Sequence, residues 1–193
     1  MKYVGNILII IGIVFISAFG YQFVKTEMLQ QSALSEAEDQ IEKAQASAAE
    51  KSPASLDEFE MDTGEAAGTL EIPKLGKTLP IVEGTDPDDL DKGVGHLKNS
   101  VWPGQDEQIL LSGHRDTVFR DFDQIEIGDE FVVNMPYGEY TYEIKETEIV
   151  PEDDTSVIGE MGEEVLVVTT CYPFHFVGAA PDRFVAYAYP VES

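Results

Sequence analysis

Three residue types that can carry out acyl transfer stand at the ends of short apolar runs. Cys171, the only cysteine, follows the run 165–170, and Arg183 opens the next run after a loop broken by Pro and Gly. His114 follows a third run, 108–113. Short apolar runs bounded by Pro and Gly are typical of buried strands. A thiol, an imidazole and a guanidinium at three strand ends indicate a cysteine transferase.

The residues around these groups resemble the signature of sortases, the cysteine transpeptidases that attach proteins to Gram-positive cell walls. The segment 170–183 carries Thr-Cys-Tyr-Pro-Phe, then Gly, Ala-Pro and Arg, and the segment 113–117 reads Gly-His-Arg-Asp-Thr. With the opening strands, the resemblance spans about residues 68–189. Tyr-Pro-Phe directly after the cysteine is most similar to class D. The chain departs from the family in having Val167-Val168 where Thr-Leu is usual, and apolar residues on a buried strand can substitute there without changing the chemistry.

The resemblance implies a function and a set of site residues. Cys171 is expected to cleave an LPxTG-like sorting signal after Thr, through a thioester, and to pass the protein to a cell-wall amine. His114 is then the proton donor and acceptor, and Arg183 stabilises the oxyanion. His96 and Thr170 are expected to contribute to substrate binding, although His96 also fits a structural role. The implied partners are surface proteins with a C-terminal sorting signal and a peptidoglycan precursor amine.

Other readings of the same residues stay open. A cysteine peptidase would use water as the acceptor, and a pilin-polymerising sortase would use a lysine. The end of the sequence at Ser193, soon after the last apolar run, favours wall anchoring over pilus assembly. A non-catalytic, membrane-tethered wall-binding barrel would carry Cys171 as a buried, inert thiol. Arg115 and Arg120, the other two arginines, are interpreted as structural salt-bridge residues.

The N-terminus predicts a membrane anchor. Residues 3–24 are nearly all apolar and are flanked by Lys2 and Lys25. About 20 apolar residues are enough to cross a bilayer as a helix. A cleaved signal peptide is the competing interpretation, but the apolar run is long and no clear cleavage site follows it. The predicted location is the cell membrane, with a single-pass anchor and, by resemblance, an extracellular catalytic domain.

Three segments are predicted along the chain. Residues 1–25 form the transmembrane anchor, residues 26–66 an acidic, partly helical linker, and residues 67–193 the catalytic domain. The linker is rich in Ala, Ser, Gln and Glu, and its helical part is expected to end at Ser52-Pro53. We expect this linker to act only as a tether that sets the reach of the domain above the membrane.

The net charge of -25, from 12 basic and 37 acidic residues, argues against nucleic acid as a partner. Acidic clusters at 86–91 and 152–154 have the oxygen ligands that calcium prefers, but they lack a recognisable loop pattern. We therefore expect no metal site and no cofactor, while calcium stimulation, known for some sortases, stays open. Cys171 and His175 have no second pair of ligands nearby, which argues against zinc.

The fold expected for 67–193 is mostly β. Segments 127–134, 139–144 and 183–189 alternate or run as strands, with Gly and Pro turns between them. A closed antiparallel β-barrel with short helices is the natural closure for such strands. The resemblance to sortases implies eight strands. The N-terminal transmembrane helix precedes this barrel.

Overall fold

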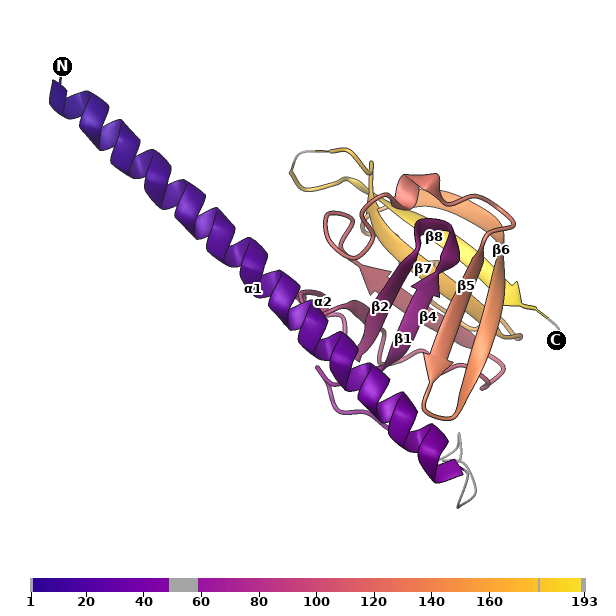
Figure 1. The fold of residues 1–193 in the computed structure, drawn as a ribbon. Helices are drawn as coiled ribbons and strands as arrows, with labels where there is room; N and C mark the ends of the chain where they lie inside the picture. The colour runs from indigo at the N-terminus through magenta and orange to yellow at the C-terminus, as the bar shows by residue number, and fades with distance from the viewer. Residues whose placement is uncertain (1, 49–58, 177, 192–193) are drawn as a thin grey trace.

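Eight strands close into a barrel in the computed structural model, which describes residues 2–48, 59–176 and 178–191 (Figure 1). The order around the barrel is β1-β2-β3-β4-β7-β8-β6-β5, and pairing of β1 with β5 closes it. The strands are β1 (Ala66–Ile72), β2 (Lys77–Glu83), β3 (Val94–His96), β4 (Gln108–Gly113), β5 (Glu130–Met135), β6 (Gly138–Pro151), β7 (Val165–Tyr172) and β8 (Asp182–Pro190).

The closed β-barrel predicted from the sequence is confirmed. Six of the strand pairs are antiparallel, as predicted, whereas β2 pairs with β3 and β4 pairs with β7 in parallel. Parallel neighbours need a crossover between them. The chain between β4 and β7 supplies it by passing through β5 and β6 on the other side of the barrel. Three short helices lie between strands: η2 (Pro73–Leu75), α2 (Pro87–Leu90) and η3 (Phe122–Gln124).

Strand β7 is buried on both of its faces. Leu166 and Val168 belong to the main core, with Phe122, Phe131 and other apolar side chains. The alternate residues Val165 and Val167 pack in a second cluster. Val157, from the segment before β7, and Val185, from β8, also belong to that second cluster. A strand buried on both faces reads as a continuous apolar run, which explains why Val-Val is accommodated before the Thr-Cys pair.

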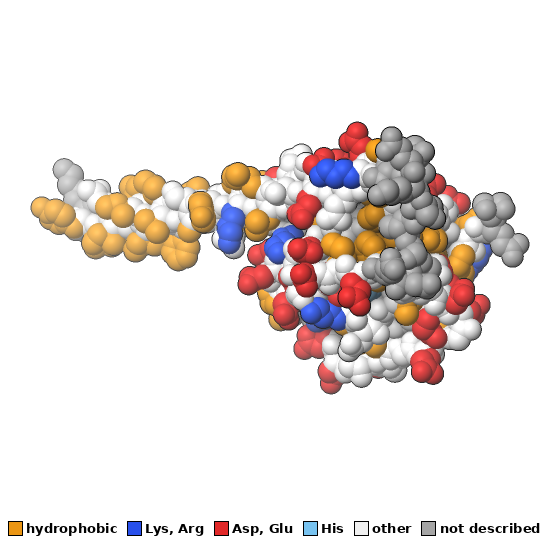
Figure 2. All heavy atoms as spheres, turned by 90° about the horizontal axis from the view of Figure 1, so that it is seen from below, with side chains coloured by type: hydrophobic (Ala, Val, Ile, Leu, Met, Phe, Trp, Pro, Cys, Tyr) orange, Lys and Arg blue, Asp and Glu red, His pale blue; other side chains and the backbone are white. Residues whose placement is uncertain are grey.

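Helix α1 (Lys2–Ala48) precedes the barrel in the chain. Its N-terminal part carries exposed apolar side chains, among them Ile10, Phe15 and Phe19, and projects beyond the barrel as an apolar arm (Figure 2). Acidic side chains are spread over the barrel surface in the same view. By length and composition, the helix over Tyr3–Ala46 can cross a membrane. An N-terminal apolar helix is only a weak sign of a membrane anchor, because a signal sequence has the same composition.

The second half of α1 packs on the barrel, alongside β1 and β2 (Figure 1). Ala33 and Ala37 are buried against Ala66 of β1 and Val82 of β2. Small side chains on both elements let the helix approach the strands closely. The segment predicted to be only a tether therefore begins as part of α1 and contributes to the domain's packing. The predicted helix end at Ser52-Pro53 lies outside the described residues.

Candidate active site

Strands β4 and β7 bring His114 and Cys171 to one rim of the barrel. They pair in parallel, and Gly113 is the partner of Thr170 at the end of the ladder. The Thr170 hydroxyl donates to the Gly113 carbonyl at 2.7 Å, which reinforces the pairing at this point. His114 and Cys171 are the next residues of the two segments. The parallel register therefore places the imidazole and the thiol at neighbouring positions of the same rim.

Strand β8 adds the guanidinium. In the antiparallel ladder between β7 and β8, Cys171 is the direct partner of Arg183. Residues directly opposite each other in such a pair project on the same face, with Cβ atoms about 5 Å apart. Cys171 is a free, half-buried cysteine. The antiparallel pairing predicted for these two residues is what the structure shows.

Arg183 is held by its own loop without being fully engaged. Its Nη1 donates to the carbonyls of Asp182 at 2.9 Å and Ala180 at 3.3 Å. Its Nη2 lies 3.5 Å from a carboxylate oxygen of Glu152, and 32% of the Arg183 side chain is exposed. A guanidinium held on one side and open on the other keeps donors available for a substrate oxygen.

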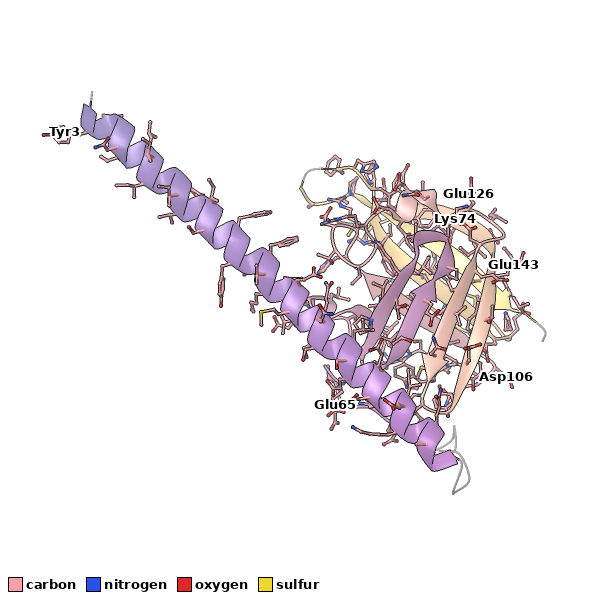
Figure 3. All side chains as sticks on the ribbon, viewed as in Figure 1. Tyr3, Glu65, Lys74, Asp106, Glu126 and Glu143 are labelled. Carbon is pink, nitrogen blue, oxygen red and sulfur yellow. The ribbon has the colours of Figure 1, made fainter. Side chains whose placement is uncertain are left out.

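The rim therefore combines three functions needed for acyl transfer. A thiol such as that of Cys171 can act as a nucleophile, an imidazole such as that of His114 can give and take a proton, and a guanidinium such as that of Arg183 can donate to an oxyanion. Figure 3 shows the two rims of the barrel: Lys74 and Glu126 mark one, and Glu65 and Asp106 the other. Lys74 and Glu126 form an ion pair of 3.2 Å at their rim.

His96 lies inside the barrel wall, away from any open surface. Its side chain is 1% exposed and both ring nitrogens are engaged, with Nδ1 2.6 Å from Glu83 and Nε2 3.0 Å from the Val101 carbonyl. The ring also stacks on Trp102, with centroids 3.7 Å apart. Because no ring nitrogen is free, this position corresponds to the structural alternative and gives no support to a substrate-binding role.

Thr170 and His175 also take defined places. Thr170 is 2% exposed and its hydroxyl is occupied by Gly113, so its observed contact is structural. His175 is exposed, and its Nε2 lies 3.4 Å from a carboxylate oxygen of Asp123. Among the residues that the structure describes, no group of three or more His, Cys, Asp or Glu side chains is arranged to hold a metal ion.

Arg115 makes more contacts than the predicted structural salt bridge. It was interpreted as a structural salt-bridge residue, and its Nε does lie 3.6 Å from Asp116. Its terminal nitrogens, however, donate to carbonyls of the loop that follows Cys171. The position of Arg115 directly after His114, in a chain with only three arginines, was the available signal.

Comparison with known proteins identifies the family. The sortase domain model matches residues 70–191. Sortase D of Bacillus subtilis (strain 168) is 46% identical over 193 residues, with 96% of each chain covered.

Solved structures agree with this result. A Clostridium perfringens Sortase D5 transpeptidase has a TM-score of 0.70 at 24% identity, over 86% of this chain and 99% of that chain, which supports the fold. Sortase C1 from Streptococcus agalactiae has a TM-score of 0.62 at 30% identity, over 69% of this chain and 72% of that chain. The chain therefore belongs to the sortase family of transpeptidases and is a homologue of its class D members.

Proposed function

We propose that this sortase cleaves an LPxTG-like sorting signal after Thr and transfers the cleaved protein to a cell-wall amine. The observation that carries the proposal is the register of three strands. The parallel ladder of β4 and β7 ends at Gly113 and Thr170, directly before His114 and Cys171, and the antiparallel ladder of β7 and β8 pairs Cys171 with Arg183. A non-catalytic barrel has no need for these three groups at one rim.

In the first half-reaction, the Cys171 thiolate attacks the carbonyl carbon of the substrate threonine. The carbonyl oxygen becomes an oxyanion, which the Arg183 guanidinium stabilises through its open donors. Collapse of this intermediate breaks the amide C–N bond, and the His114 imidazolium gives its proton to the departing amine. The product is a thioester between the threonine carbonyl and Cys171.

In the second half-reaction, an incoming amine attacks the thioester carbonyl and His114 takes up the proton that the amine loses. A second oxyanion forms at the same place, so Arg183 serves both halves. Breaking of the C–S bond restores the Cys171 thiolate and leaves a new amide. His114 ends the cycle as the imidazolium, ready for the next substrate.

Location and partners follow from the same proposal. The exposed apolar side chains of α1 suit a membrane anchor, with the barrel on the outer side of the membrane. The partners are then surface proteins that carry a C-terminal sorting signal and a peptidoglycan precursor that carries the acceptor amine. No cofactor is required by the chemistry of the three groups. We expect the basal rate to persist in EDTA, and a complete loss of activity that added calcium restores would contradict this part of the proposal. An increase of the basal rate by calcium would be the stimulation that the sequence leaves open.

The test uses the full 193-residue chain in detergent micelles. An LPxTG-type peptide is incubated with glycine or diaminopimelate-like amines, and products are identified by mass spectrometry beside Cys171→Ala. We expect cleavage after threonine with an amine-linked product that the variant does not form. Formation of the free acid alone would favour a cysteine peptidase. No Cys171-dependent product across a varied peptide set would favour the non-catalytic barrel.

A further inference from the structure

A buried guanidinium next to His114 holds the loop that leads from Cys171 to Arg183. The Arg115 side chain comes from the segment after β4, and the residue is only 8% exposed. Its Nη1 donates to the Pro173 carbonyl at 2.9 Å. Its Nη2 donates to the carbonyls of Phe176 at 2.7 Å and Gly178 at 2.9 Å. One side chain thus contacts three carbonyls of a single loop.

These contacts are unusual for a cation in so acidic a chain. A buried guanidinium needs polar partners, and 37 acidic residues are available to supply them. Yet the nearest carboxylate, that of Asp116, lies 3.6 Å from Nε and is 77% exposed. Within the described residues, Nε has no hydrogen-bond partner. The hydrogen bonds of Arg115 therefore go to backbone carbonyls. These contacts fix the backbone conformation of the loop.

Among the described residues in the middle of that loop, the other side-chain contact is an exposed one, between His175 Nε2 and a carboxylate oxygen of Asp123 at 3.4 Å. At its start, Phe174 packs on Phe184, with ring centroids 5.2 Å apart. Farther along, Phe176 is 43% exposed and Gly178 is exposed. Gly178 has φ of +108°, a conformation that other residues rarely adopt. Side-chain packing thus fixes the beginning of the loop, and the Arg115 hydrogen bonds hold its middle. The end of the loop is held by hydrogen bonds from Arg183 to the Ala180 carbonyl and from the Glu152 N–H to the Pro181 carbonyl.

Only an arginine can make this set of contacts. Its planar fork directs donors in fixed directions, so that two terminal nitrogens reach three carbonyls. A lysine carries the same charge but presents it from one compact ammonium group. The geometry therefore distinguishes a role that depends on the fork from one that depends on positive charge near the site.

We propose that Arg115 is a positioning residue, which ties the loop between Cys171 and Arg183 to the segment that carries His114. It holds the three reacting groups in their relative places and does not itself contact the substrate. The inference rests on the proposed function of those three groups. A displacement of about 1 Å between reacting groups can cost about 100-fold in rate.

The test compares Arg115→Lys and Arg115→Gln with Arg120→Gln in the full chain in micelles. Arg120 is the matched control, since it lies in the same segment, is exposed and donates to a single carbonyl, that of Asp116. Both Arg115 variants should lose about 10- to 100-fold in kcat/KM for peptide transfer. The pH values at which their rates change should stay those of the wild type, because Arg115 transfers no proton. The control should keep its activity.

Hydrogen exchange provides a second readout that does not need activity. In both Arg115 variants, the backbone amides of 174–176 and 178–180 should exchange faster than in the wild type, while strands β4 and β7 keep their protection. In the wild type, side-chain NMR should show guanidinium N–H protons of Arg115 that exchange slowly with water. This last measurement holds even if a variant does not fold.

Several results would overturn the proposal. Full activity of Arg115→Lys would show that charge suffices, and a shifted pH profile would show an electrostatic role. Unchanged loop exchange in the variants, or rapidly exchanging guanidinium protons in the wild type, would show that Arg115 does not hold the loop. If the wild type shows no Cys171-dependent transfer, the proposed function fails separately, and the exchange data still decide whether Arg115 holds the loop.

Discussion

The residues that flank strand β4 hold one loop at each end of the strand. A hydrogen-bond acceptor holds the loop at one end, and a donor holds the loop at the other. Before the strand, the Glu107 carboxylate accepts from the backbone N–H groups of Met161 and Gly162. After the strand, the Arg115 guanidinium donates to backbone carbonyls that follow Cys171. Acceptors hold one loop through its N–H groups, and donors hold the other through its C=O groups.

The two ends of β4 differ in whether nearby groups change their charge during the proposed reaction. Gln108 assists Glu107, with Nε2 donating to the Val157 carbonyl at 2.8 Å and Oε1 accepting from Gly159 at 3.2 Å. No residue of the proposed active site lies at this end of the strand. The other end carries Cys171 and His114, whose charges change during the proposed reaction. A guanidinium stays protonated throughout the accessible pH range, so its hold on the loop is independent of those changes. The difference shows how one strand can combine a structural end with a chemical one.

Removal of the imidazole should have the largest effect, and only at the chemical end. We expect His114→Ala to lower kcat/KM by about 100- to 10,000-fold, because a positioned acid and base contributes that much. The melting temperature should change little, since the side chain is half-exposed. The measurement is peptide transfer beside circular dichroism melting. His175→Ala, an exposed histidine of the same rim, is the control. A rate for His114→Ala within ten-fold of the wild type would remove His114 from the mechanism.

Truncation at the structural end should show the opposite pattern. Gln108 is 3% exposed, and Gln108→Ala leaves the Val157 carbonyl and the Gly159 N–H without their partner. The Val157 carbonyl takes part in a buried hydrogen bond, and an unsatisfied buried group costs about 1–3 kcal/mol, whereas Gly159 is exposed and its N–H can bond to water. We expect a lower melting temperature with normal transfer per folded molecule, and no such loss in the exposed Gln124→Ala. An active-site defect without a stability defect would contradict the division between the two ends.

A smaller effect is expected from the ring beside Arg115. The Arg115 guanidinium lies 5.9 Å from the centroid of the Phe176 ring. Such a cation–π contact contributes about 0.5–1 kcal/mol when exposed, or no more than about five-fold in rate. Phe176→Ala keeps the carbonyl that Arg115 binds, so peptide transfer should stay near the wild-type rate. A loss as large as that of Arg115→Gln would mean that the ring, and not the backbone, holds the loop.

The smallest effect appears only in acid. Hydrogen bonds from the backbone, that of Met161 first, lower the pKa of Glu107 below its ordinary 4.5. A carboxylate with a lowered folded-state pKa stabilises the fold above its unfolded-state pKa, and this stabilisation is lost as the pH falls through the folded-state pKa. Glu107→Gln should therefore melt earlier than the wild type at about pH 7, and the two curves should converge in acid. Glu160→Gln, on the same loop, should follow the wild type at each pH. A difference between Glu107→Gln and wild type that persists in acid would assign the effect to something other than the charge.

Much of the site was predictable because its residues are marked locally. Cys171 and Arg183 stand at the ends of two apolar runs joined by a loop, and runs in this arrangement pair as antiparallel neighbours. Because one loop joins these two runs, the pairing of Cys171 with Arg183 could be predicted from the sequence. His114 was reached differently, because β4 and β7 are parallel and about 50 residues separate them. Its place beside Cys171 depends on a crossover that no local pattern reports, and only the family resemblance indicated it.

The contacts of His96 and Arg115 could not be predicted from the sequence. A histidine in a Gly-rich segment looks available to a substrate, yet packing against Trp102 and pairing with Glu83 bury it. An arginine in an acidic chain looks like a salt-bridge residue, yet Arg115 is surrounded by carbonyls. In both cases the partners come from other parts of the chain, and residue type alone does not reveal them.

Local sequence patterns predict the elements of this protein: an apolar N-terminal helix, short strands bounded by Gly and Pro, and the residue types that acyl transfer requires. These depend on local propensity and hydrophobic patterning, which act over a few residues. Three further features are visible only in the folded chain. β4 and β7 pair in parallel, α1 packs on β1 and β2, and Arg115 donates to carbonyls of the loop after Cys171. Closure of the barrel sets those contacts, because it fixes the register between strands that are distant in the chain.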